Sequence, residues 1–283
     1  MILCDFSSII DDYDLFFFDS YGVIRNHNGL ITGIEKTIKY LQDRDKTIRI
    51  LTNDASRDAK ALLSTYVRLG IKSLTEDQII SSGMMARSYL ATKVRNGMVV
   101  YLGTERSASY ITQAGLQAIP IGKVTPEIYD EISAIVFLDD EGYDWNVDLN
   151  KTYNLLRSRN IPAIVANTDK VYPKSDKELN LATGAVARIL ETISGRTFIK
   201  FGKPDTQMYI YALESVPNYH TISKSKMLMI GDTLHTDIMG GNKFGIATTL
   251  VLSGNTSEKE ADLMIRSTSI IPDFICRSAG LEY

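Results

Sequence analysis

Carboxylates follow apolar, strand-like runs at two widely separated places in the chain. Leu15–Phe18 runs directly into Asp19, and Met227–Ile230 is followed closely by Asp232, with Asp237 five residues further on. Carboxylates without a partner histidine or cysteine suit a hard, oxygen-loving cation, and Mg²⁺ is the usual choice. An aspartate can also act as a covalent nucleophile and form an aspartyl-phosphate.

Two further strand-like runs end in residues that could bind a phosphoryl group. Ile48–Leu51 is followed by Thr52, and Phe198–Phe201 is followed closely by Lys203. A hydroxyl and a lysine suit the oxygens of a phosphoryl group. Pro204 is predicted in the first turn of the next helix, whose positive end would then point toward the bound anion.

The elements that would position these side chains alternate between strand-like and helix-like segments. Helical apolar spacing occurs, for example, at Ile34, Ile38 and Leu41, between two strand-like runs. This alternation predicts βαβ units and a mostly parallel sheet. The main apolar runs of strand length are Leu15–Phe18, Ile48–Leu51, Met98–Leu102, Ala134–Leu138, Ala163–Ala166, Met227–Ile230 and Thr248–Leu252.

The polar residues at the strand ends are predicted to meet in one crevice. If the strands that precede them are parallel neighbours, their carboxyl ends converge where open α/β sheets bind ligands. The crevice would hold Asp19, Thr52, Lys203, Asp232 and Asp237. Such a set of side chains predicts phosphoryl chemistry.

Composition excludes several other classes of protein. The chain has 283 residues, of which 44% are hydrophobic and 23% charged, as in ordinary soluble globular proteins. A net charge of -3 provides no basic surface for nucleic acid or an anionic membrane, and no apolar run is long enough to span a bilayer. Cys4 and Cys276 lie near opposite ends of the chain, which disfavours a disulfide framework or a cysteine metal site and indicates a reducing cytoplasm.

No Pro- or Gly-rich linker is present, so a second domain is expected as an insertion between core elements.

Several motifs resemble those of the haloacid dehalogenase (HAD) superfamily. Gly231–Gly241 resembles the fourth motif of its type IIA branch, which contains para-nitrophenylphosphatase-like and nucleotide-phosphatase-like members. The first three motifs are matched, in order, at Asp19, Thr52 and Lys203. Ala166–Asp169 resembles the Asn-x-Asp signature of the α/β cap in that branch.

The resemblance implies a two-part α/β fold. A Rossmann-like parallel-sheet HAD core would comprise residues 1–83 and 198–283, and an α/β type II cap domain would be inserted as residues 84–197. The implied activity is Mg²⁺-dependent hydrolysis of a small phosphorylated metabolite through an aspartyl-phosphate. The expected location is the cytoplasm, without nucleic acid or membrane partners. The sequence leaves the oligomeric state open, a homo-oligomer included.

The resemblance also implies a role for each residue of the metal site. Asp19 is expected to be the nucleophile and a ligand of Mg²⁺. Asp232 is expected to be the second carboxylate ligand, and Asp237 to complete and orient that shell. The backbone carbonyl of Tyr21 is expected to be a further ligand, a role that does not depend on its side chain.

The residues expected to hold the phosphoryl group come from the second and third motifs. Thr52, together with the backbone N–H of Asn53, would bind the phosphoryl oxygens. Lys203 would neutralise charge on both the nucleophile and the phosphate, so it is predicted to be catalytic as well as phosphate-binding.

Tyr21 departs from the family pattern, because family phosphatases have an aspartate at this position that protonates the leaving group and later activates water. Such assistance is worth roughly 10²–10⁴-fold in rate. A tyrosine with an ordinary pKa of about 10 can donate a proton but is a poor base near neutrality. The alternatives are a slow phosphatase, a replacement acid or base such as His27 or Asp54, a phosphotransfer enzyme, or a phosphate-binding protein without turnover.

Overall fold

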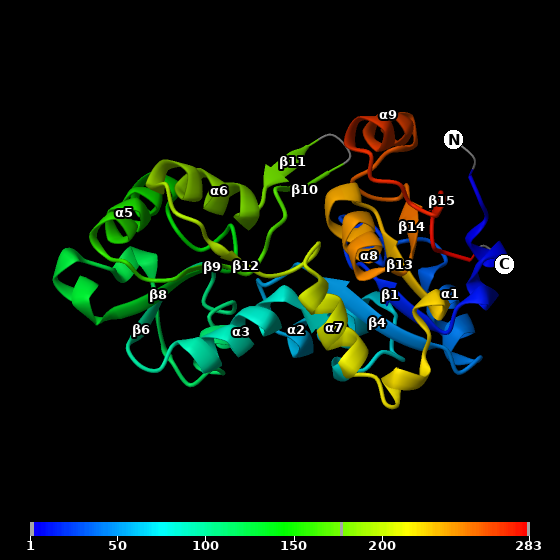
Figure 1. Ribbon diagram of the computed structural model, residues 1–283, viewed down its shortest axis with the longest axis horizontal. Helices are drawn as coiled ribbons and strands as arrows, with labels where there is room; N and C mark the ends of the chain where they lie inside the picture. The colour runs from blue at the N-terminus through cyan, green and yellow to red at the C-terminus, as the bar shows by residue number, and fades with distance from the viewer. Residues whose placement is uncertain (1–2, 176–177, 282–283) are drawn as a thin grey trace.

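The computed structural model describes residues 3–175 and 178–281, which form two α/β units side by side (Figure 1). One unit is built around a parallel sheet from both ends of the chain, and we call it the core. The other is built around a parallel sheet from the middle of the chain, and we call it the cap. This arrangement confirms the predicted fold class.

The core sheet has the strand order β15-β14-β13-β1-β4-β5, and each pair of neighbours is parallel. Since β1 lies between β13 and β4, the residues that follow these three strands share one edge of the sheet. The strands are β1 (Leu15–Phe18), β4 (Thr47–Thr52), β5 (Ile79–Ser81), β13 (Met227–Gly231), β14 (Ala247–Val251) and β15 (Phe274–Cys276).

Alternate side chains of β1 pack on opposite faces of the core sheet. Phe16 and Phe18 lie in a buried cluster with residues of α1 and α2, whereas Leu15 and Phe17 lie in another with residues of α7 and α8. A buried side chain of this size contributes about 1.5–3 kcal/mol, so both faces fix the position of β1. The core helices are α1 (Ile34–Gln42), α2 (Ala59–Leu69), α7 (Thr206–Glu214), α8 (Met239–Phe244) and α9 (Glu258–Thr268).

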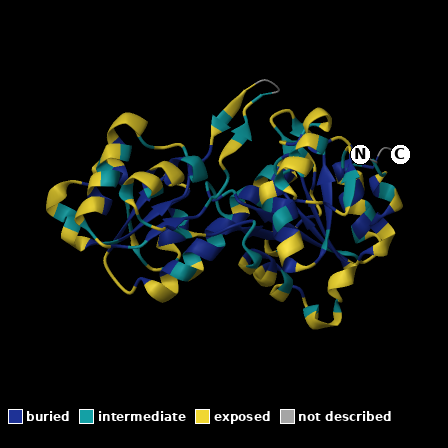
Figure 2. Cartoon of the chain, turned by 45° about the horizontal axis from the view of Figure 1, so that its top comes forward, coloured by how far each residue is buried: buried dark blue, intermediate teal, exposed yellow. Residues whose placement is uncertain are grey.

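The cap sheet has the order β12-β9-β8-β6-β7, again with parallel neighbours. Buried residues fill both sheets, while the outer faces of the helices are exposed (Figure 2). The cap strands are β6 (Met98–Leu102), β7 (Gln117–Pro120), β8 (Ile132–Phe137), β9 (Ala163–Val165) and β12 (Ile199–Lys200). The helices of this part of the chain are α3 (Ser82–Lys93), α4 (Ser109–Thr112), α5 (Trp145–Ser158) and α6 (Thr183–Ser194).

Two hairpins lie outside these sheets. One, formed by β2 (Arg25–Asn26) and β3 (Gly29–Leu30), follows β1 in the core. The other, which we call the cap hairpin, consists of β10 (Val171–Pro173), β11 (Leu179–Leu181) and the residues between them. The cap hairpin projects from the cap toward the core (Figure 1).

Each of the main strand-like runs found in the sequence overlaps a strand, but two related predictions are wrong. The strand in Phe198–Phe201 is β12 (Ile199–Lys200), which pairs with β9 in the cap sheet and is not a neighbour of β1. Pro204 does not lie in the first turn of a helix, because α7 begins at Thr206 with Asp205 as its N-cap. The domain limits at residues 84 and 197 stay a prediction; membership of β12 in the cap sheet favours a second limit after residue 200.

The two ends of the described chain meet at one edge of the core. Cys4 forms an isolated parallel bridge with Cys276 of β15, and the two Sγ atoms of these free thiols are 2.9 Å apart. None of the helices in residues 3–175 and 178–281 is long and apolar enough to cross a membrane.

Candidate active site

Three aspartates meet at the carboxyl ends of β1 and β13. Oxygen atoms of Asp19, Asp232 and Asp237 lie within 4.8 Å of one another. The exposed fractions of these residues are only 9%, 1% and 1%, respectively. The backbone N–H of Asp19 donates to the carbonyl of Ile230 on the neighbouring strand, at 2.9 Å, which fixes the end of β1 against β13. The structure therefore brings together the three carboxylates that the sequence placed in one crevice.

Lys203 lies between two of these carboxylates and is 2% exposed. Its Nζ donates to Oδ1 of Asp19 and, at 2.8 Å, to the backbone carbonyl of Leu51. The same Nζ lies 2.7 Å from Oδ1 of Asp237. Lys203 therefore forms hydrogen bonds to Asp19 and Leu51 and an ion pair with Asp237, whose buried Oδ1 has no hydrogen-bond partner among the described residues. Lys203 is thus a fixed positive charge beside the nucleophile candidate.

The site carries more buried negative charge than Lys203 can neutralise. Burial raises the pKa of Asp19 well above its usual range; Lys203 opposes that rise, while Asp237 and Asp232 add to it. Burial by itself would lower the pKa of Lys203, but Asp19 and Asp237 outweigh burial and raise it. A site with three buried carboxylates and one ammonium favours a further cation. The candidate ligand atoms are carboxylate oxygens, which Mg²⁺ prefers, so the residues present fit Mg²⁺.

Asp232 is held by residues that the sequence analysis did not identify. Its Oδ2 accepts the backbone N–H of Asn255 at 2.6 Å, and its Oδ1 accepts the hydroxyl of Thr233 at 2.9 Å. The hydroxyl of Thr256 donates to the Asp232 carbonyl at 2.6 Å. Thr233 lies within the segment that resembles the fourth motif. Asn255 and Thr256 lie in a short polar run after β14, and such runs are common in loops, so the sequence did not indicate their role. These contacts orient the carboxylate toward the cluster.

Two glycines allow the backbone to pass directly beside Asp232. Gly22 has φ +91°, and a Cβ atom there would lie 2.0 Å from Oδ2 of Asp232. A Cβ atom at Gly254 would lie 1.9 Å from the same oxygen. Real Cβ atoms cannot approach so closely, so both positions require glycine for the carboxylate to keep its place.

We expect Gly22→Ala to weaken Mg²⁺ binding by at least about 10-fold, since displacing a group that orients a metal ligand typically costs 10–100-fold in affinity. Isothermal titration calorimetry on the folded variant would measure the change. Gly29→Ala is the matched control, because Gly29 also has a positive φ, of +121°, but a Cβ there would meet nothing within 4 Å. Equal Mg²⁺ affinities for the two variants would contradict the importance of this close approach.

Thr52 and Asn53 lie where β4 ends, beside the cluster. Thr52 is buried, and its hydroxyl accepts the N–H of Asp54 at 3.1 Å. The side chain of Asn53 joins two other segments: its Oδ1 accepts the N–H of Lys203 at 2.8 Å, and its Nδ2 donates to Oδ1 of Asp169 at 2.8 Å. Asn53 therefore connects the core to the cap residue of the Asn-x-Asp signature.

Tyr21 directs its hydroxyl to the cap hairpin. The hydroxyl donates to the backbone carbonyl of Pro173 at 2.7 Å. The guanidinium of Arg25 lies 5.2 Å from the centre of the Tyr21 ring. Burial raises the pKa of Tyr21 above its ordinary value, with Arg25 opposing the rise, so the phenol keeps its proton near neutrality.

The two residues considered as replacements for the missing carboxylate lie in different settings. His27 is exposed in the turn between β2 and β3. Asp54 follows the end of β4; its Oδ1 accepts from the N–H and hydroxyl of Ser56, and its Oδ2 lies 3.6 Å from Nε of Arg57. Along the chain, Asp54 is closer than His27 to Thr52 and Asn53, the predicted phosphoryl-binding residues. Its carboxylate already contacts Ser56 and Arg57.

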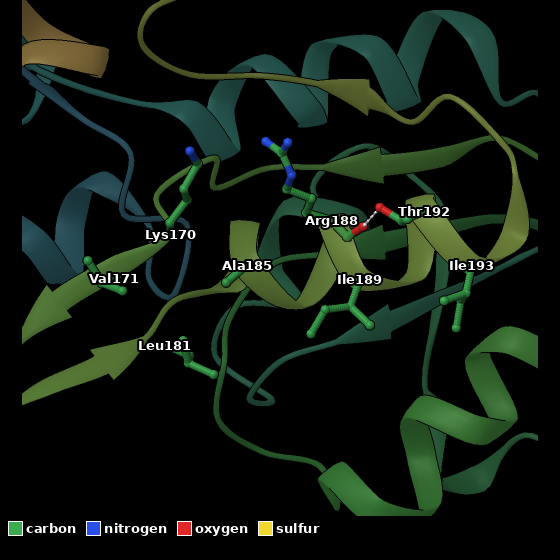
Figure 3. Close-up of a pocket in the computed structure, with 8 residues that line it drawn as sticks. All are labelled: Lys170, Val171, Leu181, Ala185, Arg188, Ile189, Thr192 and Ile193. Atoms are coloured by element: carbon green, nitrogen blue, oxygen red, sulfur yellow. Dashed lines mark hydrogen bonds between the residues drawn. The ribbon is translucent and has the colours of Figure 1, made fainter. Parts of the chain in front are cut away.

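A separate pocket of about 450 Å³ lies on the cap, between the cap hairpin and α6 (Figure 3). Its lining is apolar with two basic residues and one hydroxyl, which does not resemble the carboxylate cluster. The pocket is lined by Lys170, Val171, Leu181, Ala185, Arg188, Ile189, Thr192 and Ile193. The groups suited to phosphoryl chemistry therefore belong to the core sheet edge and not to this pocket.

Family comparisons match both parts of the core. Residues 16–117 match the model of the haloacid dehalogenase-like hydrolases, and residues 200–278 match a HAD-hydrolase-like model. These ranges include the predicted nucleophile, phosphate-binding and metal residues.

Individual relatives cover nearly the whole chain. A crystal structure from Cytophaga hutchinsonii, described as a possible sugar phosphatase of the HAD superfamily, is 48% identical with a TM-score of 0.96 and full coverage of both chains. Phosphoglycolate phosphatase 2 of Arabidopsis thaliana is 30% identical over 95% of this chain and 92% of that protein. Bovine (Bos taurus) chronophin is 26% identical over 92% of this chain and 89% of its own length.

Proposed function

Because this chain belongs to the haloacid dehalogenase-like hydrolases, as a phosphatase of their type IIA branch, we propose that it hydrolyses a small phosphorylated metabolite with Mg²⁺ and through an aspartyl-phosphate on Asp19. The observation that carries this proposal is the buried cluster of Asp19, Asp232 and Asp237 around Lys203. Among the described residues, no other group of three or more His, Cys, Asp or Glu side chains lies close enough together to hold a metal ion.

Asp19 is the proposed nucleophile because it lies at the end of the central strand with its carboxylate held by Lys203. In the first step, an oxygen of Asp19 attacks phosphorus, the bond to the leaving oxygen breaks, and that oxygen takes up a proton. In the second step, water attacks the aspartyl-phosphate and releases inorganic phosphate, which restores the Asp19 carboxylate. Splitting hydrolysis into two substitutions is the usual benefit of a covalent intermediate.

Asp19 and Asp232, together with the backbone carbonyl of Tyr21, are proposed to hold Mg²⁺, and Asp237 is proposed to complete the shell. Bound there, Mg²⁺ would reduce repulsion between the carboxylate nucleophile and the phosphoryl oxygens. Thr52 and the backbone N–H of Asn53 are proposed to bind those oxygens. Lys203, which donates to Asp19 and to the Leu51 carbonyl, contributes its positive charge and keeps the Asp19 carboxylate in one orientation.

Tyr21 does not supply the proton in the arrangement described, because its hydroxyl donates to Pro173. We therefore propose that turnover depends chiefly on the metal, Lys203 and the nucleophile, with the leaving group protonated by solvent or another side chain. A binding protein without turnover is not favoured, since the relatives include a phosphoglycolate phosphatase and a glycerol-3-phosphate phosphatase. The cytoplasmic location and the small-metabolite substrate stay part of this proposal.

Phosphatase activity toward para-nitrophenyl phosphate should fall to background in excess EDTA and return on addition of Mg²⁺. The Mg²⁺ concentration for half-maximal activity should rise by about 10-fold or more in Asp232→Asn, because a charged ligand is lost. Asp262→Asn, which alters an exposed aspartate paired with Arg266, is the control and should match the wild type. Full activity in EDTA, or an unchanged Mg²⁺ requirement in Asp232→Asn, would contradict the metal assignment.

A further inference from the structure

The cap hairpin depends on outside contacts for its position. Its two strands form a sheet of their own, separate from the cap sheet, and an isolated two-stranded sheet is marginally stable in water. Val171, Leu179 and Leu181 are exposed by 38%, 63% and 48%. The hairpin therefore has little packing of its own, and the polar contacts on either side of it determine where it lies.

On the cap side, the hairpin is held by Asp140. The hydroxyl of Tyr172 donates to Oδ2 of Asp140 at 3.0 Å, and Nδ2 of Asn180 donates to the Tyr172 hydroxyl at 3.2 Å. These contacts involve one residue from each strand of the hairpin. They fix it to the loop that follows β8, within its own unit.

On the core side, the hairpin is held by Tyr21, only two residues after the proposed nucleophile. Its hydroxyl donates to the Pro173 carbonyl at 2.7 Å. The ring is held from the core by Arg25, whose backbone forms an isolated bridge with Tyr21 and whose guanidinium lies 5.2 Å from the ring centre. The residue that replaces the family's acid/base aspartate is therefore used as a contact between the two units.

A second contact joins the units at the base of the same segment. Asn53 donates to Asp169 at 2.8 Å, and Asp169 lies two residues before β10. Tyr21 follows β1 and Asn53 follows β4, which are neighbouring strands of the core sheet. Residues from two adjacent catalytic strand ends thus hold one continuous stretch of the cap, from Asp169 to Pro173.

We propose that Tyr21 is a positioning residue whose hydroxyl anchors the cap hairpin beside the segment that follows Asp19, so that the hairpin is held in one place next to the site. This proposal rests on the proposed phosphatase function. Two roles are thereby separated at one residue: the backbone carbonyl serves the metal site, and the side chain serves the contact with the cap. Loss of the hydroxyl should then loosen the hairpin without removing any charged group from the site.

Hydrogen–deuterium exchange on the full-length protein tests the anchor without any need for activity. In Tyr21→Phe, the ring stays but the hydroxyl's hydrogen bonds to Pro173 and to the His27 backbone are lost. The backbone amides of Val171, Tyr172, Lys174, Ser175 and residues 178–181 should then exchange about 2- to 10-fold faster, the factor that corresponds to one ordinary hydrogen bond. Tyr211→Phe, which removes a hydroxyl from an exposed position on α7, is the control and should leave hairpin exchange unchanged. Unchanged exchange in Tyr21→Phe would overturn the proposal.

Kinetics separate an anchoring role from an acid role. With para-nitrophenyl phosphate and phenyl phosphate, which are similar in size but differ in leaving-group basicity, Tyr21→Phe should lower kcat/KM by a similar factor of about 2- to 10-fold for both, mainly through KM. A loss that is much larger for phenyl phosphate, approaching roughly 10²-fold, would identify the hydroxyl as a general acid and overturn the anchor. An inactive wild-type protein would instead contradict the proposed function, while the exchange measurement would still decide the role of Tyr21.

Discussion

Asp19→Asn should lose phosphatase turnover by a factor on the order of 10⁴ to 10⁶, the scale of loss when other enzymes lack their covalent nucleophile. An amide oxygen is a poor nucleophile and cannot form the aspartyl-phosphate. The substitution keeps the size of the side chain, so the strand end and its bond to β13 should persist. Burst and steady-state assays with para-nitrophenyl phosphate would measure the loss.

Asp14→Asn is a suitable control, since Asp14 precedes β1 at the opposite end of the same strand and pairs with Lys46 near the surface. That variant should retain wild-type turnover. Beryllofluoride, which mimics a phosphoryl group on a carboxylate, should inhibit the wild type but not Asp19→Asn. Turnover in Asp19→Asn within about 10-fold of the wild type would remove Asp19 from the role of nucleophile.

Lys203→Met should lower the free energy of unfolding by about 3–5 kcal/mol in the absence of metal, because removal of one partner leaves buried charges uncompensated. Lys203 is 2% exposed and pairs with Asp19 and Asp237, which are 9% and 1% exposed, so little water can take its place. Methionine fills a similar volume, so the effect reports charge and not a cavity. Urea unfolding followed by circular dichroism in EDTA would measure it.

Lys39→Met tests the same substitution in an exposed ion pair. Lys39 pairs with Asp43 one turn along α1, and such pairs contribute about 0.3–0.5 kcal/mol. The difference between the two variants therefore isolates the effect of burial. A loss below about 1 kcal/mol in Lys203→Met would show that the aspartates do not depend on Lys203 for their neutralisation. Saturating Mg²⁺ should recover part of the stability of Lys203→Met by supplying positive charge to the cluster.

The sequence was sufficient to predict the strands that carry two of the aspartates. A central parallel strand is buried on both faces and must be apolar throughout, so Leu15–Phe18 and Met227–Ile230 stand out from their surroundings. Asp19 and Asp232 follow these runs closely, and the two strands proved to be neighbours. Here the local pattern contains the information, because burial on both faces constrains every residue of the strand.

The sequence was not sufficient to assign the strand before Lys203 to a sheet. Phe198–Phe201 has the composition of a strand, but composition does not determine which edge a strand joins, and β12 pairs with β9 of the cap. Lys203 still reaches Asp19 because the side chain of Asn53 accepts the N–H of Lys203 and donates to its carbonyl, at 2.8 and 3.1 Å. That pair of hydrogen bonds joins segments 150 residues apart, which no local pattern can reveal.

Tyr21 also shows the difference between what the sequence determines, its residue type, and what the structure determines, its hydrogen-bond partner. The sequence alone determined that a phenol stands where family phosphatases have a carboxylate, and therefore that a donor is present and a base is not. Only the tertiary structure decided that this donor bonds to the carbonyl of Pro173, 152 residues away. The physical reason is that a residue type fixes which hydrogen bonds a side chain can form, whereas the partner is chosen by the packing of remote segments around it.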